Sequence, residues 1–178
     1  MSDDAIGGNV TQADGVDAQH SCTCRTTEAP APEVRAEASH FERIGGAAAI
    51  DRLVEAFYAR MDSLTVAAAI RAMHADDLSP MKDVLKRYLG EWLGGPPLYS
   101  QERGHPRLRM RHLHFKIGEA ERDAWLTCMQ GALQAEVTDP PLRGELLERF
   151  AKLADWMRND PGNPHDGRHA AKLQISQT

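Results

Sequence analysis

Apolar residues recur at helical spacing in four separate stretches of this chain, and this pattern constrains the fold more than any other feature. Spacings near three and four residues place such side chains along one face of a helix, toward a core. The stripes are Leu53, Val54, Phe57, Tyr58 and Met61; Met81, Val84, Leu85, Tyr88, Leu89 and Trp92; Trp125, Cys128, Met129 and Leu133; and Leu142, Leu146, Phe150, Leu153 and Met157. No stretch of useful length alternates as a strand does. The predicted fold class is all-α, with irregular connections.

The second stripe has clear helix boundaries. Ser79 followed by Pro80 predicts a helix start, with Ser79 as the cap and Pro80 in the first turn. Two glycines and two prolines at residues 94–97 end this helix. Residues 98–117 show little periodicity, so we expect a loop there with a short helix near residues 107–113.

Both ends of the chain differ in composition from its middle. Residues 1–39 contain no aromatic residue and few branched aliphatic ones, so they cannot bury enough apolar surface to offset the entropy of ordering. We expect a disordered acidic tail over residues 1–40 and a folded domain over residues 41–158. Residues 159–178 are rich in Pro, Gly and His and are expected to form a flexible tail.

Charge and cysteine content exclude several classes of protein. The first 40 residues account for the whole net charge of −5, and the rest of the chain is neutral, which argues against nucleic acid as the main ligand. No run of about 18 apolar residues predicts a membrane span, and the acidic N-terminus does not resemble a secretory signal. Three cysteines are too few for a disulfide framework. The expected location is therefore the reducing cytoplasm.

Several ordered motifs carry more information than periodicity. They are Phe41-Glu42-Arg43-Ile44-Gly45-Gly46, Phe57-Tyr58, Gly94-Gly95-Pro96, Gly104-His105-Pro106-Arg107-Leu108-Arg109-Met110-Arg111-His112-Leu113-His114-Phe115, and Glu121-Arg122-Asp123-Ala124-Trp125-Leu126. In order and spacing this set resembles the truncated haemoglobins of group II. The resemblance covers about residues 41–158, and it implies a two-over-two helical sandwich that holds one haem b.

The resemblance implies that His112 is the axial ligand of the haem iron. Globin iron needs one strong nitrogen donor on its proximal side, and an imidazole supplies it. His114 is the rival ligand, and it stands where relatives often have proline, so the sequence departs from the family pattern there. Without the resemblance, His112 would be interpreted as a surface histidine in a basic loop. His105, before Pro106, is interpreted as a residue that structures the loop.

On the other face of the haem, the resemblance places Tyr58, His74, Met81, Leu85 and Trp125. A buried hydroxyl and a buried indole N–H need hydrogen-bond partners, and a diatomic ligand with partial negative charge can accept from both Tyr58 and Trp125. The alternative is that both are simply core aromatics. His74 is either a third donor or a residue that packs on the haem, and its coordination of iron is an open question. Met81 and Leu85 provide apolar contacts.

The two haem propionates need cations or hydroxyls. Arg111 and Tyr99 are the first candidates, and Lys86 and Arg87 are weaker ones. Arginine suits carboxylates because its planar fork can donate two parallel hydrogen bonds.

The cysteines allow other chemistry. His20, Cys22 and Cys24 lie together in the N-terminal tail. They form either a Zn(II) or Cu(I) site, a redox-active thiol pair, or unpaired tail thiols. Cys128 lies on an apolar stripe and is expected to be a buried, inert thiol.

The function that the resemblance implies is a haem protein that binds dioxygen, nitric oxide and carbon monoxide, for oxygen transport or sensing. The alternative is an enzyme, a nitric oxide dioxygenase or a peroxidase-like protein. No flavin or nicotinamide module is evident in the sequence, so such an enzyme would need a separate reductase. A helical interaction domain without a cofactor is the third interpretation.

Overall fold

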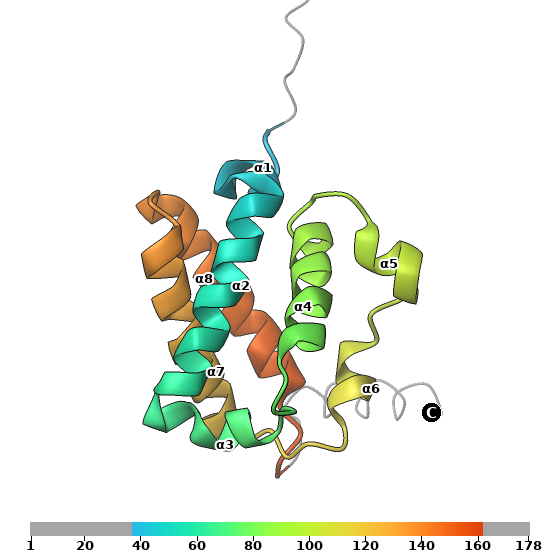
Figure 1. Ribbon diagram of the computed structural model, residues 1–178, viewed down its shortest axis with the longest axis vertical. Coiled ribbons are helices and arrows are strands. Elements are labelled where there is room, and N and C mark those ends of the chain that lie inside the picture. Colours follow the sequence, from blue (N-terminus) through green and yellow to red (C-terminus); the bar gives the residue numbers. More distant parts are fainter. Residues whose placement is uncertain (1–36, 162–178) are drawn as a thin grey trace, which may run out of the picture. The chain divides into compact units, whose positions relative to one another are not determined.

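The computed structural model describes residues 37–161, and within them every regular element is helical (Figure 1). The elements are α1 (His40–Ile44), α2 (Gly46–Ser63), the 3₁₀ turn η1 (Thr65–Ala67), α3 (Ala68–Ala72), α4 (Ser79–Trp92), α5 (Leu98–Arg103), α6 (Leu108–His112), α7 (Glu119–Glu136) and α8 (Pro140–Met157). The all-α prediction is confirmed. The predictions for residues 1–36 and 162–178, which include Cys22 and Cys24, lie outside the described residues.

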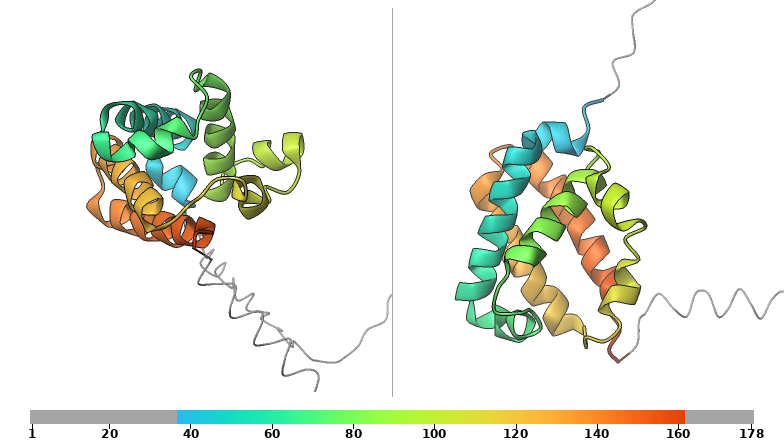
Figure 2. Two further views of the ribbon diagram at one scale, coloured as in Figure 1. Left: turned by 90° about the horizontal axis from the view of Figure 1, so that it is seen from below. Right: turned by 45° about the vertical axis from the view of Figure 1, so that its right-hand side comes forward.

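The four predicted stripes lie on the four longest helices, which form two layers. α2 contacts α4 and α7, and α7 contacts α8. Figure 2 shows α2 and α4 lying across α7 and α8. Among residues 37–161, no helix is both long and apolar enough to span a lipid bilayer.

The core is centred on α2, and the four long helices contribute to it unequally. α2 has seven buried residues and α7 has five, whereas α4 has only two, Leu89 and Gly90. Burying a large apolar side chain stabilises the fold by about 1.5–3 kcal/mol. The core therefore fixes α2 and α7 firmly, while most of the apolar stripe on α4 is incompletely covered.

Phe41 explains why two pairs of glycines occur in the motifs. Its ring packs beside Gly46 and so close to Gly95 that a Cβ atom on Gly95 would lie 2.7 Å from the ring. The Phe41 amide also donates to the Leu93 carbonyl at 2.9 Å. Gly45 ends α1 with a φ of +107°, a conformation that favours glycine. The start of the domain is thereby fixed against the end of α4.

The start of α4 differs by one residue from the prediction. Ser79 is the first helical residue rather than the cap, and its amide donates to the carboxylate of Asp77 at 2.9 Å. A charged carboxylate is a strong hydrogen-bond acceptor. Hydrogen bonds from Ser79 lower the pKa of Asp77. Pro80 lies in the first turn as predicted. The predicted loop over residues 98–117 contains the expected short helix, α6, and one that was not expected, α5.

Candidate functional site

Apolar side chains on α4 and α6 are left without full cover. Met81 on α4 is 47% exposed, and Leu85 is half-buried. No residue of α6 is buried, and Met110 is 61% exposed. Figures 1 and 2 show α6 beside the C-terminal end of α8, on the side of the molecule where α4 and α5 lie. A large apolar ligand fits such a surface, because it would remove these side chains from water.

His112 ends α6, and its imidazole is oriented by its own helical turn. Its Nδ1 lies 2.7 Å from the Leu108 carbonyl oxygen, so Nδ1 carries the proton and donates. The other nitrogen, Nε2, then has a free lone pair, and it makes no hydrogen bond within residues 37–161. Histidines that bind metals in proteins typically donate their second ring nitrogen in this way. The half-buried His112 therefore has the donor geometry that an iron ligand requires.

The two other histidines of this segment lie differently. His114 is exposed, and its ring packs against Phe115 with 4.3 Å between centroids. The Nδ1 of His105 accepts the Arg107 amide at 3.1 Å, just before α6 begins. Arg107 has a φ of +44°, in the left-handed region that non-glycine residues seldom adopt. His105 thus supports the strained start of α6.

Tyr58 lies in the core, with its polar atom unused. It is 3% exposed, and its ring packs edge-on against Phe57 and His74, with centroids 5.0 and 5.8 Å away. Within the described part of the chain, its hydroxyl has no hydrogen-bond partner. Burial raises the pKa of Tyr58 to about 12, so the hydroxyl stays protonated at neutral pH. It is therefore available to donate to a ligand.

Trp125 approaches the same region from α7. Its ring lies 5.2 Å from Phe57 and 5.8 Å from Phe150, centroid to centroid. It is only half-buried, although core residues surround it. Phe57 thus contacts both Tyr58 and Trp125, and the structure brings these two predicted donors together around one ring.

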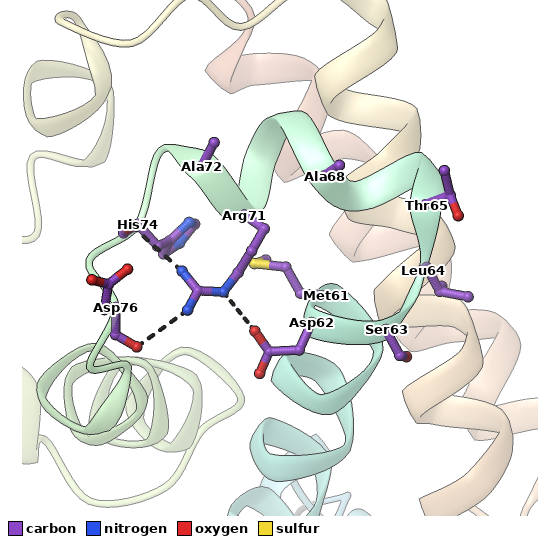
Figure 3. Close-up of a pocket in the computed structure, with 10 residues that line it drawn as sticks. All are labelled: Met61, Asp62, Ser63, Leu64, Thr65, Ala68, Arg71, Ala72, His74 and Asp76. Atoms are coloured by element: carbon purple, nitrogen blue, oxygen red, sulfur yellow. Dashed lines mark hydrogen bonds and ion pairs between the residues drawn. The ribbon is translucent and has the colours of Figure 1, made fainter.

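His74 lies in the loop between α3 and α4, and Arg71 holds this loop in place. The Arg71 guanidinium donates to the Asp62 carboxylate at 2.5 Å and to the carbonyls of His74, Ala75 and Asp76 at 3.4, 3.0 and 3.2 Å. Figure 3 shows the guanidinium between Asp62 and the loop. The His74 Nδ1 lies 2.8 Å from a carbonyl oxygen of α3, which leaves Nε2 free.

A surface pocket of about 620 Å³ lies at this corner of the molecule (Figure 3). Its lining includes Arg71, Asp62, Asp76 and His74, and therefore is largely polar. None of Tyr58, His112 or Trp125 contributes to it. This pocket is distinct from the apolar surface of α4 and α6.

The remaining predicted site residues divide into two groups. Tyr99 is buried, with its ring edge-on to Tyr88 at 5.6 Å. Arg111 is exposed, its Nε donates to a loop carbonyl at 3.0 Å, and its other guanidinium nitrogens make no hydrogen bond to residues 37–161. Lys86 and Arg87 already have acidic partners: Lys86 lies 3.0 Å from Glu55, and Arg87 pairs with Glu102. The assignment of Arg111 and Tyr99 to the propionates stays a prediction.

No cluster of three or more His, Cys, Asp or Glu side chains suited to a metal ion occurs among residues 37–161. Cys128 is fully buried, and burial raises the pKa of its thiol, so it is protonated and unreactive at neutral pH. A single histidine plus an apolar surface is the donor set that suits haem, whose porphyrin supplies the other ligands of its iron.

Sequence reasoning missed two residues that hold the site. Arg71 carries no motif, and Asn159 was assigned to the flexible C-terminal tail. The structure instead gives Asn159 hydrogen bonds to His112, Phe115 and Ile117. An asparagine after a helix and before a Pro-Gly pair has the local signature of a turn. Nothing in the local sequence indicates partners more than 40 residues away.

Comparisons with known proteins agree with this geometry. The family Bacterial-like globin matches residues 39–159. The chain is 37% identical over 110 residues to Group 2 truncated hemoglobin YjbI of Bacillus subtilis, a match that covers 62% of this chain and 81% of that protein.

Solved structures give the same result. A group II 2-on-2 hemoglobin from Agrobacterium tumefaciens is 40% identical, with a TM-score of 0.67 over 70% of this chain and 98% of its own. A hemoglobin from Chloroflexus aurantiacus is 41% identical, with a TM-score of 0.64 over 69% of this chain and 99% of its own. The predicted two-over-two sandwich is confirmed. The chain therefore belongs to the bacterial-like globin family, has the fold of the two-on-two truncated haemoglobins, and by this membership is expected to carry haem as its cofactor.

Proposed function

We propose that this protein binds haem b through His112 and uses it to bind dioxygen and other diatomic ligands. The observation that carries the proposal is the hydrogen bond from the His112 Nδ1 to the Leu108 carbonyl at 2.7 Å. This bond fixes the imidazole tautomer and directs the Nε2 lone pair away from the helical turn. Within the described residues His114 makes no comparable hydrogen bond, and its exposed ring packs against Phe115.

The haem would lie against the uncovered apolar side chains of α4 and α6. Met81 and Leu85 would contact its ring, and burying them supplies part of the binding free energy. Arg111 would neutralise a propionate through its free guanidinium nitrogens, and the Tyr99 hydroxyl would donate to the other. Haem held in this way supplies an iron atom that binds diatomic gases reversibly.

Tyr58 and Trp125 would control the ligand on the distal side. Both carry a donor without a partner in the described residues, and both pack on Phe57. Each would donate to a ligand that gains negative charge on binding. His74 packs edge-on to Tyr58 and has its Nε2 free, so it is placed to be either a third donor or a packing residue.

The enzymatic alternative is a nitric oxide dioxygenase or a peroxidase-like protein served by a separate reductase. It uses the same residues and differs in requiring rapid re-reduction of the iron. Mixing the oxygenated protein with nitric oxide in a stopped-flow instrument, and then adding cell extract, measures that step. Fast reaction followed by reduction would favour the enzyme, and slow reduction would favour reversible binding.

The absorption spectrum of the purified full chain, reduced and without ligand, tests the proposal. We expect stoichiometric haem with the spectrum of iron bound by one histidine. A chain that binds no haem would contradict the proposal. A six-coordinate spectrum that becomes five-coordinate in His74→Ala would identify His74 as a second ligand.

A further inference from the structure

α6 is too short to hold His112 in place by itself. It has five residues, and an isolated helix of that length is unstable in water. None of its residues is buried, so the core does not fix it either. The bond to Leu108 orients the imidazole within α6, but the placement of α6, and His112 with it, must depend on contacts from outside the helix.

Asn159, two residues after the end of α8, provides these contacts. Its Nδ2 donates to the His112 carbonyl at 3.1 Å and to the Phe115 carbonyl at 2.9 Å, and its Oδ1 accepts the Ile117 amide at 2.9 Å. The main-chain amides of Asn159 and Asp160 both donate to the Ile117 carbonyl, at 2.9 and 3.2 Å. These bonds connect the end of α8 to the whole segment that follows His112.

The orientation of the Asn159 amide follows from its partners. Two of them are carbonyl oxygens, which only accept, and one is an N–H group, which only donates. The reversed orientation would place the amide oxygen against both carbonyls.

A second contact joins α6 and α8. The guanidinium of Arg109 on α6 lies 4.9 Å from the ring centroid of Trp156 on α8.

We propose that Asn159 is a positioning residue for His112. Its side-chain amide is hydrogen-bonded to the carbonyls of His112 and Phe115 and to the N–H of Ile117. These bonds fix the end of α6 and so set the direction in which the His112 imidazole leaves it. This inference rests on the proposed role of His112 as the iron ligand. Asn159 itself touches neither the haem nor its ligand in this account.

A matched set of variants isolates this role. Asn159→Asp keeps the size of the side chain and an acceptor for Ile117, but it loses both donors and places a carboxylate against two carbonyls. Asn159→Ala removes the whole amide. Glu121→Ala is the control. Glu121 accepts the amide of Gly118, the residue that follows Ile117, at 2.8 Å, and it makes no hydrogen bond to residues 112–115.

Two readouts apply to the full chain loaded with haem. The first is the rate at which haem is lost to an excess of a haem-free scavenger globin, and the second is the iron–imidazole stretching band in the resonance Raman spectrum of the reduced protein. We expect Asn159→Asp and Asn159→Ala to lose haem at least about tenfold faster than the parent and to shift or broaden the band. Glu121→Ala is expected to leave the band unchanged and to lose haem within about twofold of the parent rate.

A second background separates positioning from general loosening. In His112→Gly supplied with free imidazole, the iron ligand is no longer attached to α6. Asn159→Asp should then have no further effect on the iron–imidazole band, because its effect requires the covalent link between the imidazole and α6. A band that shifts equally in both backgrounds would overturn the proposal, and so would Asn159 variants that behave like Glu121→Ala.

The failure of this inference is distinguishable from the failure of the proposed function. If His112→Gly keeps its haem and its spectrum without added imidazole, His112 is not the ligand and the proposed function is wrong. If His112 is the ligand but the Asn159 variants keep the parent band, only the positioning role is wrong. Hydrogen exchange of the Ile117 amide in the haem-free protein gives an independent check, since Asn159→Ala should accelerate it at least about tenfold.

Discussion

Tyr58 and Trp125 come from 18-residue helices of the core, whereas His112 comes from a single helical turn between two loops. α2 and α7 have seven and five buried residues, and α6 has none. Tyr58 and Trp125, the proposed distal donors, are therefore positioned by apolar packing, and His112 is positioned by hydrogen bonds from Asn159, just after α8. Packing resists local change, while a segment held by a few polar contacts opens more easily.

The largest expected difference between the two regions is in stability. Phe57→Ala removes the ring that contacts both Tyr58 and Trp125, and it should lower the free energy of unfolding by about 3–5 kcal/mol. Leu113→Ala, at a position that is 63% exposed next to α6, should change it by less than about 0.5 kcal/mol. Urea unfolding of the haem-free protein measures both. Equal costs would show that the proximal segment is packed as tightly as the core.

The next largest effect concerns dioxygen release. Tyr58→Phe and Trp125→Phe each remove one donor to a partly charged acceptor, which is worth about 1.5–3 kcal/mol. Either change should speed dioxygen dissociation by roughly tenfold to a hundredfold. Carbon monoxide gains less charge on binding, so its dissociation should change much less.

The two gases provide the control for this experiment. If both substitutions leave dioxygen dissociation within about twofold of the parent, or change both gases equally, these residues are only core aromatics. The double variant need not show the product of the two effects, because donors that share one acceptor are coupled.

A smaller effect is expected at the distal loop. Arg71→Lys keeps the charge but cannot make the four hydrogen bonds that join Asp62 to the loop of His74, and it should destabilise the fold by about 1–2 kcal/mol. Arg52→Lys is a matched control, since Arg52 makes one hydrogen bond, to Glu136. If the two variants have the same unfolding midpoint, Arg71 does not hold the loop.

The smallest effect is a pH dependence at the distal site. Burial raises the pKa of Tyr58 from 10.0 to about 12, so its hydroxyl donates at all pH values below that and is lost as a donor only as the pH rises through it. Stability from this group is likewise complete below pH 10 and falls as the pH rises toward 12. Dioxygen dissociation should therefore be constant from pH 7 to pH 10 and accelerate above.

Tyr88 provides the control, because burial also raises its pKa to about 12. Tyr58→Phe should abolish the acceleration, and Tyr88→Phe should retain it. An acceleration that survives in Tyr58→Phe would assign the titration to another group.

The contrast between the packed core helices and the hydrogen-bonded segment of α6 also explains which features the sequence could predict. Periodicity identified α2, α4, α7 and α8, because burial of one helix face repeats every three or four residues. The start of α4 was one residue off, since Leu78 is the cap residue and the carboxylate of Asp77 accepts the amide of Ser79. Asn159 and Arg71 could not be found, because most of their partners are main-chain groups whose positions only the fold determines. His112 was selected by a family motif and not by any local physical signal.

The absorption spectra of His112→Ala and His114→Ala, measured beside the parent protein, test the central claim most directly. We expect His112→Ala to lose most of its haem and the spectrum of histidine-bound iron, because Nε2 of His112 is the donor that α6 leaves free. His114→Ala should keep both, since its ring is exposed and, among residues 37–161, packs only against Phe115. A His112→Ala protein with full haem and an unchanged spectrum, alongside a His114→Ala protein without them, would contradict the account.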